Sequence, residues 1–201
     1  YLPSLEELGK LLKLCADAKW LPFGKAMHAQ FLIRNQTSNH SDITHLNPLV
    51  HLYVKCGQLG LARNLIDAMP LRNVVSWNAL MAGYLHGGNH LEVLVFLKNM
   101  VSLQNACPNE YVFTTALSAC SHGGRVKEGM QCHELLFKFG LVCDQYVKSA
   151  LVHMYSMCSS VELALQVLDT VPGGHVIVND IFSYNTVLTA LWNLGVGKRL
   201  W

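Results

Sequence analysis

Cysteines and histidines are the residues of this sequence whose chemistry first invites a functional interpretation. The chain holds 7 cysteines and 10 histidines in 201 residues. The cysteines are odd in number, widely spaced and without a C-x-x-C pair, which is a poor match to a disulfide framework or a zinc site. We therefore expect reduced thiols in an intracellular compartment, packed as small apolar side chains.

One short segment has part of the pattern of a catalytic metal site. His90, Leu91 and Glu92 match the H-x-E of zinc cytidine deaminases, but the P-C-x-x-C that supplies the remaining ligands does not follow. We interpret this segment as the start of a helix. No Gly-rich phosphate loop and no nucleophile–base pair stands out, so the sequence predicts a protein that is not an enzyme and that needs no metal or cofactor.

Composition and charge narrow the class of protein. Apolar residues make up 51% and charged residues 14% of the chain, against roughly 25% charged in a typical soluble domain. Such a chain has enough apolar surface to offset its ordering entropy, which excludes intrinsic disorder. Every apolar run is interrupted before about 18 residues, so we expect no membrane-spanning helix. The net charge of +2 argues neither for nor against nucleic-acid binding.

Comparison of the sequence with itself reveals an internal repeat. Pro48–Pro70 and Ala150–Pro172 lie 102 residues apart and share nine identities in 23 positions, several times what chance would supply. Two further pairs of segments match at offsets of 105 and 107 residues. This indicates a higher-order repeat of about 105 residues made of three smaller repeats. The matched pairs include Cys15/Cys120, Gly24/Gly129, His28/His133, His51/His153, Tyr53/Tyr155, Cys56/Cys158, Ser76/Ser183 and Asn78/Asn185.

Each small repeat is predicted to form two helices. Apolar residues recur at helical spacing in Asn47–Val54, and the pattern resumes in Leu59–Met69 after a break at Gly57. Pro70 cannot continue the second helix, because proline lacks the N–H group. The same unit is predicted at Trp77–Tyr84 with His90–Met100, and at Val112–Cys120 with Val126–Lys138. No segment alternates as a strand does, so the fold class is all-α, a solenoid of helix-turn-helix repeats. Histidines at equivalent repeat positions lie a repeat apart, so we expect them to pack and hydrogen-bond rather than to bind a metal.

Five segments have a more specific pattern: Gly24-Lys25-Ala26-Met27-His28, Leu52-Tyr53-Val54-Lys55-Cys56-Gly57, Met69-Pro70, Val74-Val75-Ser76-Trp77-Asn78-Ala79-Leu80 and Met154-Tyr155-Ser156-Met157-Cys158. They resemble the plant pentatricopeptide repeat (PPR) family. The alternation of motif lengths is similar to the P, L and S motifs of the PLS subclass. The resemblance implies a right-handed α–α superhelix in which one repeat recognises one base of single-stranded RNA.

The resemblance divides residues 1–201 as a single array of motifs. The predicted frame is Leu5–Asp42 (L), Ile43–Asn73 (S), Val74–Asn109 (P), Glu110–Asp144 (L), Gln145–Asp180 (S) and Ile181–Trp201 (the first helix of another P motif). Ser159 replaces the turn glycine found at Gly57, from which we expect a looser or differently shaped turn.

In this family the fifth residue of a motif meets the base edge, and the last residue assists it, often through water. The fifth residues by position are Gly9, Asn47, Asn78, Thr114, Ser149 and Asn185, and the last residues are Asp42, Asn73, Asn109, Asp144 and Asp180. The resemblance implies that the pairs of asparagines, Asn47 with Asn73 and Asn78 with Asn109, prefer C over U. It implies G for Ser149 with Asp180, and for Thr114 with Asp144 where an L motif contacts a base. Gly9 offers no side chain.

The second residue of each motif flanks the base in this family. These residues are Thr44, Val75, Tyr111, Tyr146 and Phe182. The three aromatic members suit base stacking, worth about 1–3 kcal/mol per base. The alternative is that an aromatic residue at a helix start packs against the next repeat.

The resemblance therefore implies sequence-specific binding of single-stranded organellar RNA, as target recognition for C-to-U editing. The deaminase activity would come from a domain in cis or from editing-complex proteins in trans. Two alternatives stay open: a protein-interaction solenoid, and an RNA stabilisation or splicing factor without editing. We expect location in the mitochondrion, with the chloroplast as the alternative, no membrane partner, and a chain that is a fragment without its targeting peptide.

Overall fold

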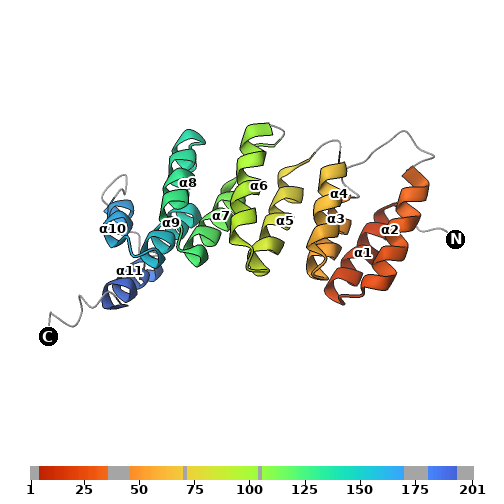
Figure 1. Ribbon diagram of the computed structural model, residues 1–201, viewed down its shortest axis with the longest axis horizontal. Coiled ribbons are helices and arrows are strands. Elements are labelled where there is room, and N and C mark those ends of the chain that lie inside the picture. The colour runs from red at the N-terminus through yellow and green to blue at the C-terminus, as the bar shows by residue number, and fades with distance from the viewer. Residues whose placement is uncertain (1–4, 36–45, 70–71, 104–105, 170–180, 194–201) are drawn as a thin grey trace. The chain divides into compact units, whose positions relative to one another are not determined.

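The computed structural model describes residues 5–35, 46–69, 72–103, 106–169 and 181–193, and these residues form α-helices without strands (Figure 1). The chain divides into two compact units, Tyr1–Asn89 with Asn99–Cys107, and His90–Lys98 with Pro108–Trp201. The helices of the first unit are α1 (Leu5–Asp17), α2 (Leu21–Asn35), α3 (Leu46–Lys55), α4 (Leu59–Ala68) and α5 (Val74–His86). Helix α6 (His90–Leu103) is divided between the units. The second unit contains α7 (Glu110–Gly123), α8 (Val126–Lys138), α9 (Gln145–Met157), α10 (Val161–Asp169) and α11 (Ile181–Asn193).

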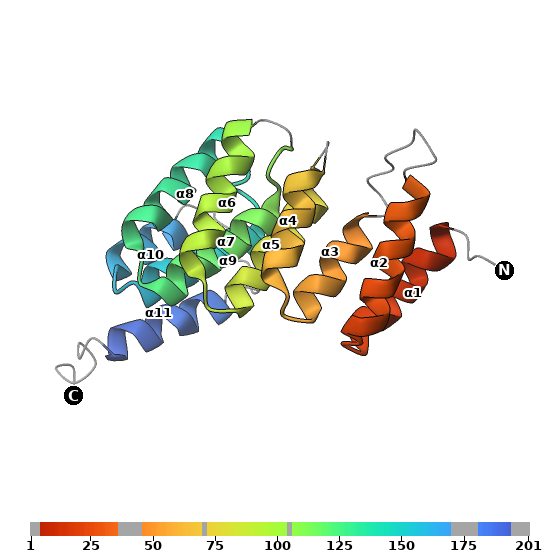
Figure 2. The ribbon, with the colours of Figure 1, turned by 45° about the vertical axis from the view of Figure 1, so that its right-hand side comes forward.

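Within each unit the helices stack as hairpins. The first helices of successive hairpins contact one another in series, α1 with α3 and α3 with α5, then α7 with α9 and α9 with α11. Within each unit a second helix contacts its own first helix and the next one, as α2 lies against α1 and α3, and α8 against α7 and α9 (Figures 1 and 2). The described part of the chain is thus an all-α solenoid, which confirms the fold class predicted from the repeats.

Apolar spacing explains why the two helices of a hairpin differ. In α10 the buried residues Val161, Ala164 and Leu168 follow helical spacing and form one stripe. In α7 burial extends around a wider face, from Ala119 on one margin to Ser121 on the other. A first helix is covered by neighbours on two sides, whereas a second helix keeps a solvent face. Among the described helices, none combines the length and apolar character needed to cross a membrane.

Each predicted helix is present, although most extend beyond their predicted bounds, and one predicted turn is wrong. Helix α8 covers Val126–Lys138 as the pattern indicated, and α6 begins at His90, so the H-x-E segment is a helix start. Ser159, however, adopts a φ of 59°, close to the 71° of Gly57. The backbone bonds also match, because Ser160 N donates to Tyr155 O at 2.9 Å and Gln58 N donates to Tyr53 O at 2.8 Å. The serine therefore makes the glycine-type turn rather than a different one.

The repeat-equivalent glycine and histidine pairs form the same helix contact in both units. A Cβ atom at Gly24 of α2 would collide with the methyl groups of Leu52 of α3, so a larger residue here would displace the buried Leu52 side chain. One turn further along α2, His28 Nδ1 is hydrogen-bonded to the Tyr53 hydroxyl of α3 at 2.6 Å.

The second unit repeats this contact. Gly129 of α8 approaches Met154 of α9 equally closely, and His133 Nδ1 is hydrogen-bonded to the Tyr155 hydroxyl at 3.0 Å. Histidine thus hydrogen-bonds and packs, as its repeat phase indicated. The two histidines recur at the same repeat position because both units contain the same hydrogen bond between a histidine of a second helix and a tyrosine of the next first helix.

The cysteines are partly as predicted. Cys15, Cys120 and Cys132 are buried, whereas Cys107 and Cys143 are exposed and so are not packed as small apolar residues. A hydrogen bond with Cys132 and burial raise the pKa of the Cys120 thiol, and burial raises the pKa of the Cys15 thiol. Raised pKa values keep these buried thiols protonated at neutral pH, and a thiol is a weak nucleophile and a poor metal ligand compared with a thiolate.

Replacement of Ser159 by glycine is expected to stabilise the second unit. A non-glycine residue at positive φ costs about 1–2 kcal/mol, and the larger freedom of glycine in the unfolded chain offsets part of that gain. We expect Ser159→Gly to raise the free energy of unfolding by about 0.5–1 kcal/mol in urea denaturation followed by circular dichroism.

The matched control is Gly57→Ala. No atom lies within 4 Å of a Cβ built at Gly57, so this substitution changes backbone strain without a clash. It should lower the free energy of unfolding by about 1 kcal/mol. A loss of stability in Ser159→Gly would show that the serine hydroxyl matters more than its backbone.

Stability is expected to fall as the pH drops below about 6.5. Burial lowers the pKa of four half-buried histidines, His28, His51, His133 and His153. Between these lowered values and about 6.5 the unfolded chain binds more protons than the folded chain, so the free energy of unfolding rises with pH through that window and levels off above it.

Urea midpoints measured between about pH 5 and about pH 8 would check this. In the double variant His28→Gln, His133→Gln the dependence should be shallower, because two of the four groups no longer titrate. A midpoint that stays constant, or that rises toward acid, would contradict the effect of burial.

Candidate nucleic-acid interface

The last residues of three motifs begin the first helix of the next hairpin. The Oδ1 atoms of Asn73, Asn109 and Asp144 accept hydrogen bonds from the backbone N–H groups three residues on, at 2.9, 3.2 and 3.0 Å. Each side chain is therefore an N-cap, the role that Asn and Asp perform best at a helix start. The sequence interpretation assigned these residues to RNA alone. The structure adds that one oxygen of each is used by the fold, so only the remaining polar atoms are available to a ligand.

A buried serine joins the two predicted base-contacting residues of the motif Ile43–Asn73. The Ser76 hydroxyl in α5 lies 2.6 Å from Asn47 Oδ1 in α3 and 2.9 Å from Asn73 Oδ1. Asn47 and Asn73 are both half-buried, whereas Ser76 has no exposed surface. The fifth and last residues of one motif thus meet at a single hydroxyl.

The second unit contains the equivalent contact. Ser183 of α11 donates from its hydroxyl to the Ser149 hydroxyl of α9 at 3.3 Å, and Ser183 is 1% exposed. Ser183 holds the same repeat position as Ser76. The sequence comparison matched these two serines but gave them no role. Their burial, and a neighbour that lies a whole motif earlier in the chain, are visible only in three dimensions.

The remaining predicted base-contacting residues differ in their surroundings. The Thr114 hydroxyl donates to the Tyr111 carbonyl of its own helix at 3.0 Å, so it is turned along α7. Asn78 is half-buried and Asn185 is exposed. Asp42, Thr44 and Asp180 lie outside the described residues.

The second residues of the motifs are exposed. Val75, Tyr111, Tyr146 and Phe182 have 57%, 63%, 79% and 68% of their surface accessible, although each lies in the first turn of a first helix. Large apolar side chains that could have packed against a neighbour instead point into solvent. The packing alternative considered for the aromatic residues therefore does not describe Tyr111, Tyr146 or Phe182.

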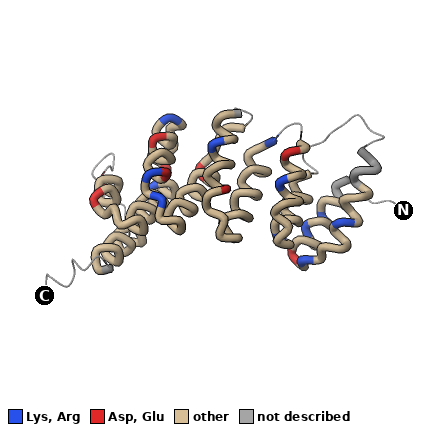
Figure 3. The backbone as a smooth tube through the Cα atoms, viewed as in Figure 1, with Lys and Arg blue, Asp and Glu red and all other residues tan. Residues whose placement is uncertain are grey.

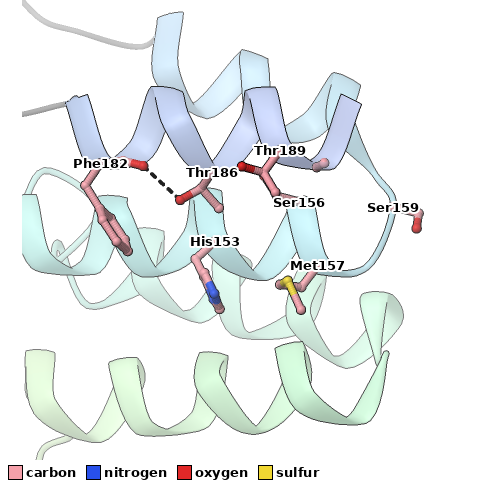
Figure 4. Close-up of a pocket in the computed structure, with 8 residues that line it drawn as sticks. His153, Ser156, Met157, Ser159, Phe182, Thr186 and Thr189 are labelled. Atoms are coloured by element: carbon pink, nitrogen blue, oxygen red, sulfur yellow. Dashed lines mark hydrogen bonds between the residues drawn. The ribbon is translucent and has the colours of Figure 1, made fainter. Parts of the chain in front are cut away.

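A hollow of about 410 Å³ adjoins one of these aromatic residues. It lies between α9 and α11 and is lined by Phe182, His153, Met157 and Thr189 among others (Figure 4). The Thr186 hydroxyl donates to the Phe182 carbonyl at 2.8 Å, the bond drawn dashed in the figure. Burial and the nearby His122 lower the pKa of His153, which favours its neutral form. The hollow thus combines an aromatic ring with uncharged polar groups.

Charged side chains contribute little to this surface. Lysines and arginines are interspersed with acidic residues along the helices (Figure 3), and Arg125 forms an ion pair with Glu128 at 2.8 Å. Lys148, one residue before Ser149, donates to the Leu168 carbonyl at 3.3 Å. In the described ranges no group of three or more His, Cys, Asp or Glu side chains could hold a metal ion. Apart from the carboxylate of Asp144, the described residues that were predicted to contact or flank a base are uncharged, which suits hydrogen bonding and stacking.

The fold and this face define a class of protein, an α-solenoid of helical-hairpin repeats with a polar and aromatic face on its first helices. The sequence profile of the PPR repeat matches residues 75–104 and 111–141. The chain belongs to the pentatricopeptide repeat family.

Relatives in Arabidopsis thaliana support this assignment. A pentatricopeptide repeat-containing protein is 43% identical over 168 residues, which is 84% of this chain and 24% of that protein. A second, named as chloroplastic, is 35% identical over 81% of this chain and 26% of its own length. A third, named as mitochondrial, is 31% identical over 96% of this chain and 24% of its own length. The chain spans about a quarter of the length of these curated relatives.

A solved structure shows the same fold. The crystal structure of the pentatricopeptide repeat protein PPR10 from maize superposes with a TM-score of 0.65 at 18% identity, over 100% of this chain and 30% of that one. At this level of identity the likeness concerns the arrangement of the helices.

Substitutions of Asn109 are expected to show how much its N-cap contributes to stability. Asn109→Ala removes the acceptor for the Val112 N–H group and should lower the free energy of unfolding by about 1 kcal/mol. Asn109→Asp keeps an acceptor oxygen and places a negative charge at the positive end of α7, so its stability should match or exceed that of the wild type. Urea denaturation followed by circular dichroism measures both, and equal losses in the two variants would refute the capping role.

Proposed function

We propose that this chain binds single-stranded RNA in a sequence-dependent manner through the first helices of its repeats. The pentatricopeptide repeat is a binding repeat in which each unit contacts one base, rather than a catalytic one. The proposed base-contacting residues are Asn47, Asn73, Asn78, Asn109, Thr114, Asp144, Ser149, Asp180 and Asn185, and the proposed base-flanking residues are Thr44, Val75, Tyr111, Tyr146 and Phe182.

The exposed aromatic residues at one repeat position are the observation that carries this proposal. Tyr111, Tyr146 and Phe182 stand at the second place of three successive first helices and remain 63–79% exposed. A protein gains nothing in stability from leaving these rings in water, and a nucleobase is a flat partner that covers such a ring. Stacking does not require positive charge, which fits a chain with a net charge of only +2.

The more specific part of the proposal is target recognition for C-to-U RNA editing in a plant organelle. Its support is the similarity of the motif lengths to the P, L and S motifs of the PLS subclass. The names of two relatives, one mitochondrial and one chloroplastic, are in keeping with an organelle. The deaminase would then be a domain elsewhere in the protein or a separate editing factor. RNA stabilisation or splicing without editing would use the same base-contacting face.

The rival class is a protein-interaction solenoid. Such a surface would more naturally carry charged or apolar residues at the fifth position, varying from repeat to repeat. The fifth positions here hold small amides and hydroxyls, at Asn47, Asn78, Thr114, Ser149 and Asn185. These groups suit hydrogen bonding to base edges, because they donate and accept without the entropy loss of a long side chain.

Removal of one stacking ring is expected to weaken RNA binding without unfolding the protein. An RNA is first selected from a random single-stranded pool with the full-length protein at fixed salt, since affinity depends on salt. Tyr146→Ala should then raise the dissociation constant for that RNA by about tenfold, the effect of one lost base stack. Fluorescence anisotropy measures the affinity, and thermal unfolding should be unchanged because Tyr146 is 79% exposed.

The control is Phe137→Ala, which removes an exposed ring from the second helix α8. Phe137 is 62% exposed, and its substitution should leave RNA affinity unchanged. Equal effects in the two variants would mean that exposed rings bind RNA non-specifically. A pool that yields no enriched RNA would reject RNA binding and favour the protein-interaction solenoid.

A further inference from the structure

We propose that Ser76 and Ser183 are positioning residues. Each orients the base-contacting side chain of the preceding motif so that its hydrogen-bond donor, rather than its acceptor, is presented to RNA. This inference rests on the proposed RNA binding and extends it to two residues outside the fifth, last and second positions. Each serine is the third residue of its own motif, and each bonds to the fifth residue of the motif before it.

The direction of the Ser76 side chain is unusual for a hydroxyl near a helix start. Serine and threonine hydroxyls inside helices commonly bond to a carbonyl of their own helix. Thr115 and Thr186 do so, with donations to Tyr111 O and Phe182 O at 2.8 Å. Ser76 instead reaches from α5 to Asn47 of α3, and it does so with no exposed surface, so water cannot substitute for this partner.

The hydrogen-bond geometry fixes the orientation of two amides. Asn73 Oδ1 already accepts from the Ser76 backbone N–H at 2.9 Å. The single hydroxyl hydrogen of Ser76 can be donated to Asn47 Oδ1 or to Asn73 Oδ1. The hydrogen bond to Asn47 Oδ1 is the stronger, because that oxygen is closer, at 2.6 Å. Both amide oxygens are therefore held toward Ser76. The amide nitrogens, which are donors, are turned away from it.

This orientation matters because cytosine and uracil differ at N3. Cytosine N3 is an acceptor, whereas uracil N3 carries a hydrogen and is a donor. An amide nitrogen that faces this position is complementary to cytosine and opposes uracil, and an amide oxygen would do the reverse. Ser76 thus favours C over U at the base opposite the motif Ile43–Asn73, because it holds the oxygen of Asn47 away from the base.

In the second unit the equivalent hydrogen bond orients the hydroxyl of Ser149. Ser183 donates to Ser149 Oγ, which uses acceptor capacity of Ser149 and leaves its own hydrogen to donate elsewhere. A donor at this place is complementary to O6 of guanine, where adenine carries an amino group that is itself a donor. Ser183 therefore supports the G preference proposed for the motif Gln145–Asp180.

The test is base preference in the variants Ser76→Ala and Ser183→Ala of the full-length protein. The wild type first selects an RNA from a random pool, which fixes the register. Affinities are then measured by fluorescence anisotropy for RNAs that differ in one base. We expect Ser76→Ala to reduce the preference for C over U opposite Ile43–Asn73 by about three- to tenfold, the value of one hydrogen bond.

The two variants serve as controls for each other. Ser76→Ala should leave the preference opposite Gln145–Asp180 unchanged, and Ser183→Ala should reduce the G preference there and leave the C preference intact. The base opposite the motif Val74–Asn109, which contains Ser76 itself, should also be unaffected. Both variants keep the backbone N–H group at the changed residue, so Ser76→Ala retains the N-cap of α5.

Two results would overturn the inference while RNA binding stands. One is an unchanged C-to-U ratio in Ser76→Ala. The other is an equal loss of affinity for every RNA, which would show that Ser76 contributes only to packing. If the wild type enriches no RNA at all, the proposed function fails and this inference fails with it.

Discussion

Within each unit, the packing of a second helix against two successive first helices is the contact on which the rest of the structure depends. A single hairpin cannot cover its own apolar face, so the next first helix must supply the cover. In both units a glycine lies at this contact, Gly24 against Leu52 and Gly129 against Met154, where a Cβ atom would displace the facing side chain. Because the second helices are held in this way, the first helices of a unit lie side by side and their N-terminal turns come together.

That arrangement explains why residues assigned to RNA also serve the fold. An N-cap must lie at the start of a first helix, and the fifth residue of the previous motif lies beside that start. The Oδ1 atom of Asn73 caps α5, and it also approaches the Ser76 hydroxyl that donates to Asn47, the fifth residue of the same motif. The fold thereby orients polar groups that would otherwise rotate freely. A preoriented donor loses little entropy when a base arrives.

Much of this architecture could be predicted from the sequence. The repeat offsets, the apolar spacing and the breaks at glycine and proline predicted the helical hairpins, and α8 was predicted to the residue. The local sequence pattern gave a wrong prediction at Ser159, where a serine stands in place of the glycine of the equivalent turn. Ser159 keeps the positive φ of the glycine it replaces, because the hydrogen bonds of the surrounding turn define that conformation. The exposed Cys107 and Cys143 were likewise missed, since burial depends on distant neighbours.

The sequence by itself determined the class of fold, the number of residues between equivalent positions and the identity of the polar and aromatic residues that recur. These properties follow from local spacing, which helix geometry converts directly into faces and turns. Only the tertiary structure decided which of the recurring residues touch. The partners of Ser76 and of His133 became visible only when α5 lay beside α3, and α8 beside α9, because a hydrogen bond between helices depends on distances that no local pattern contains.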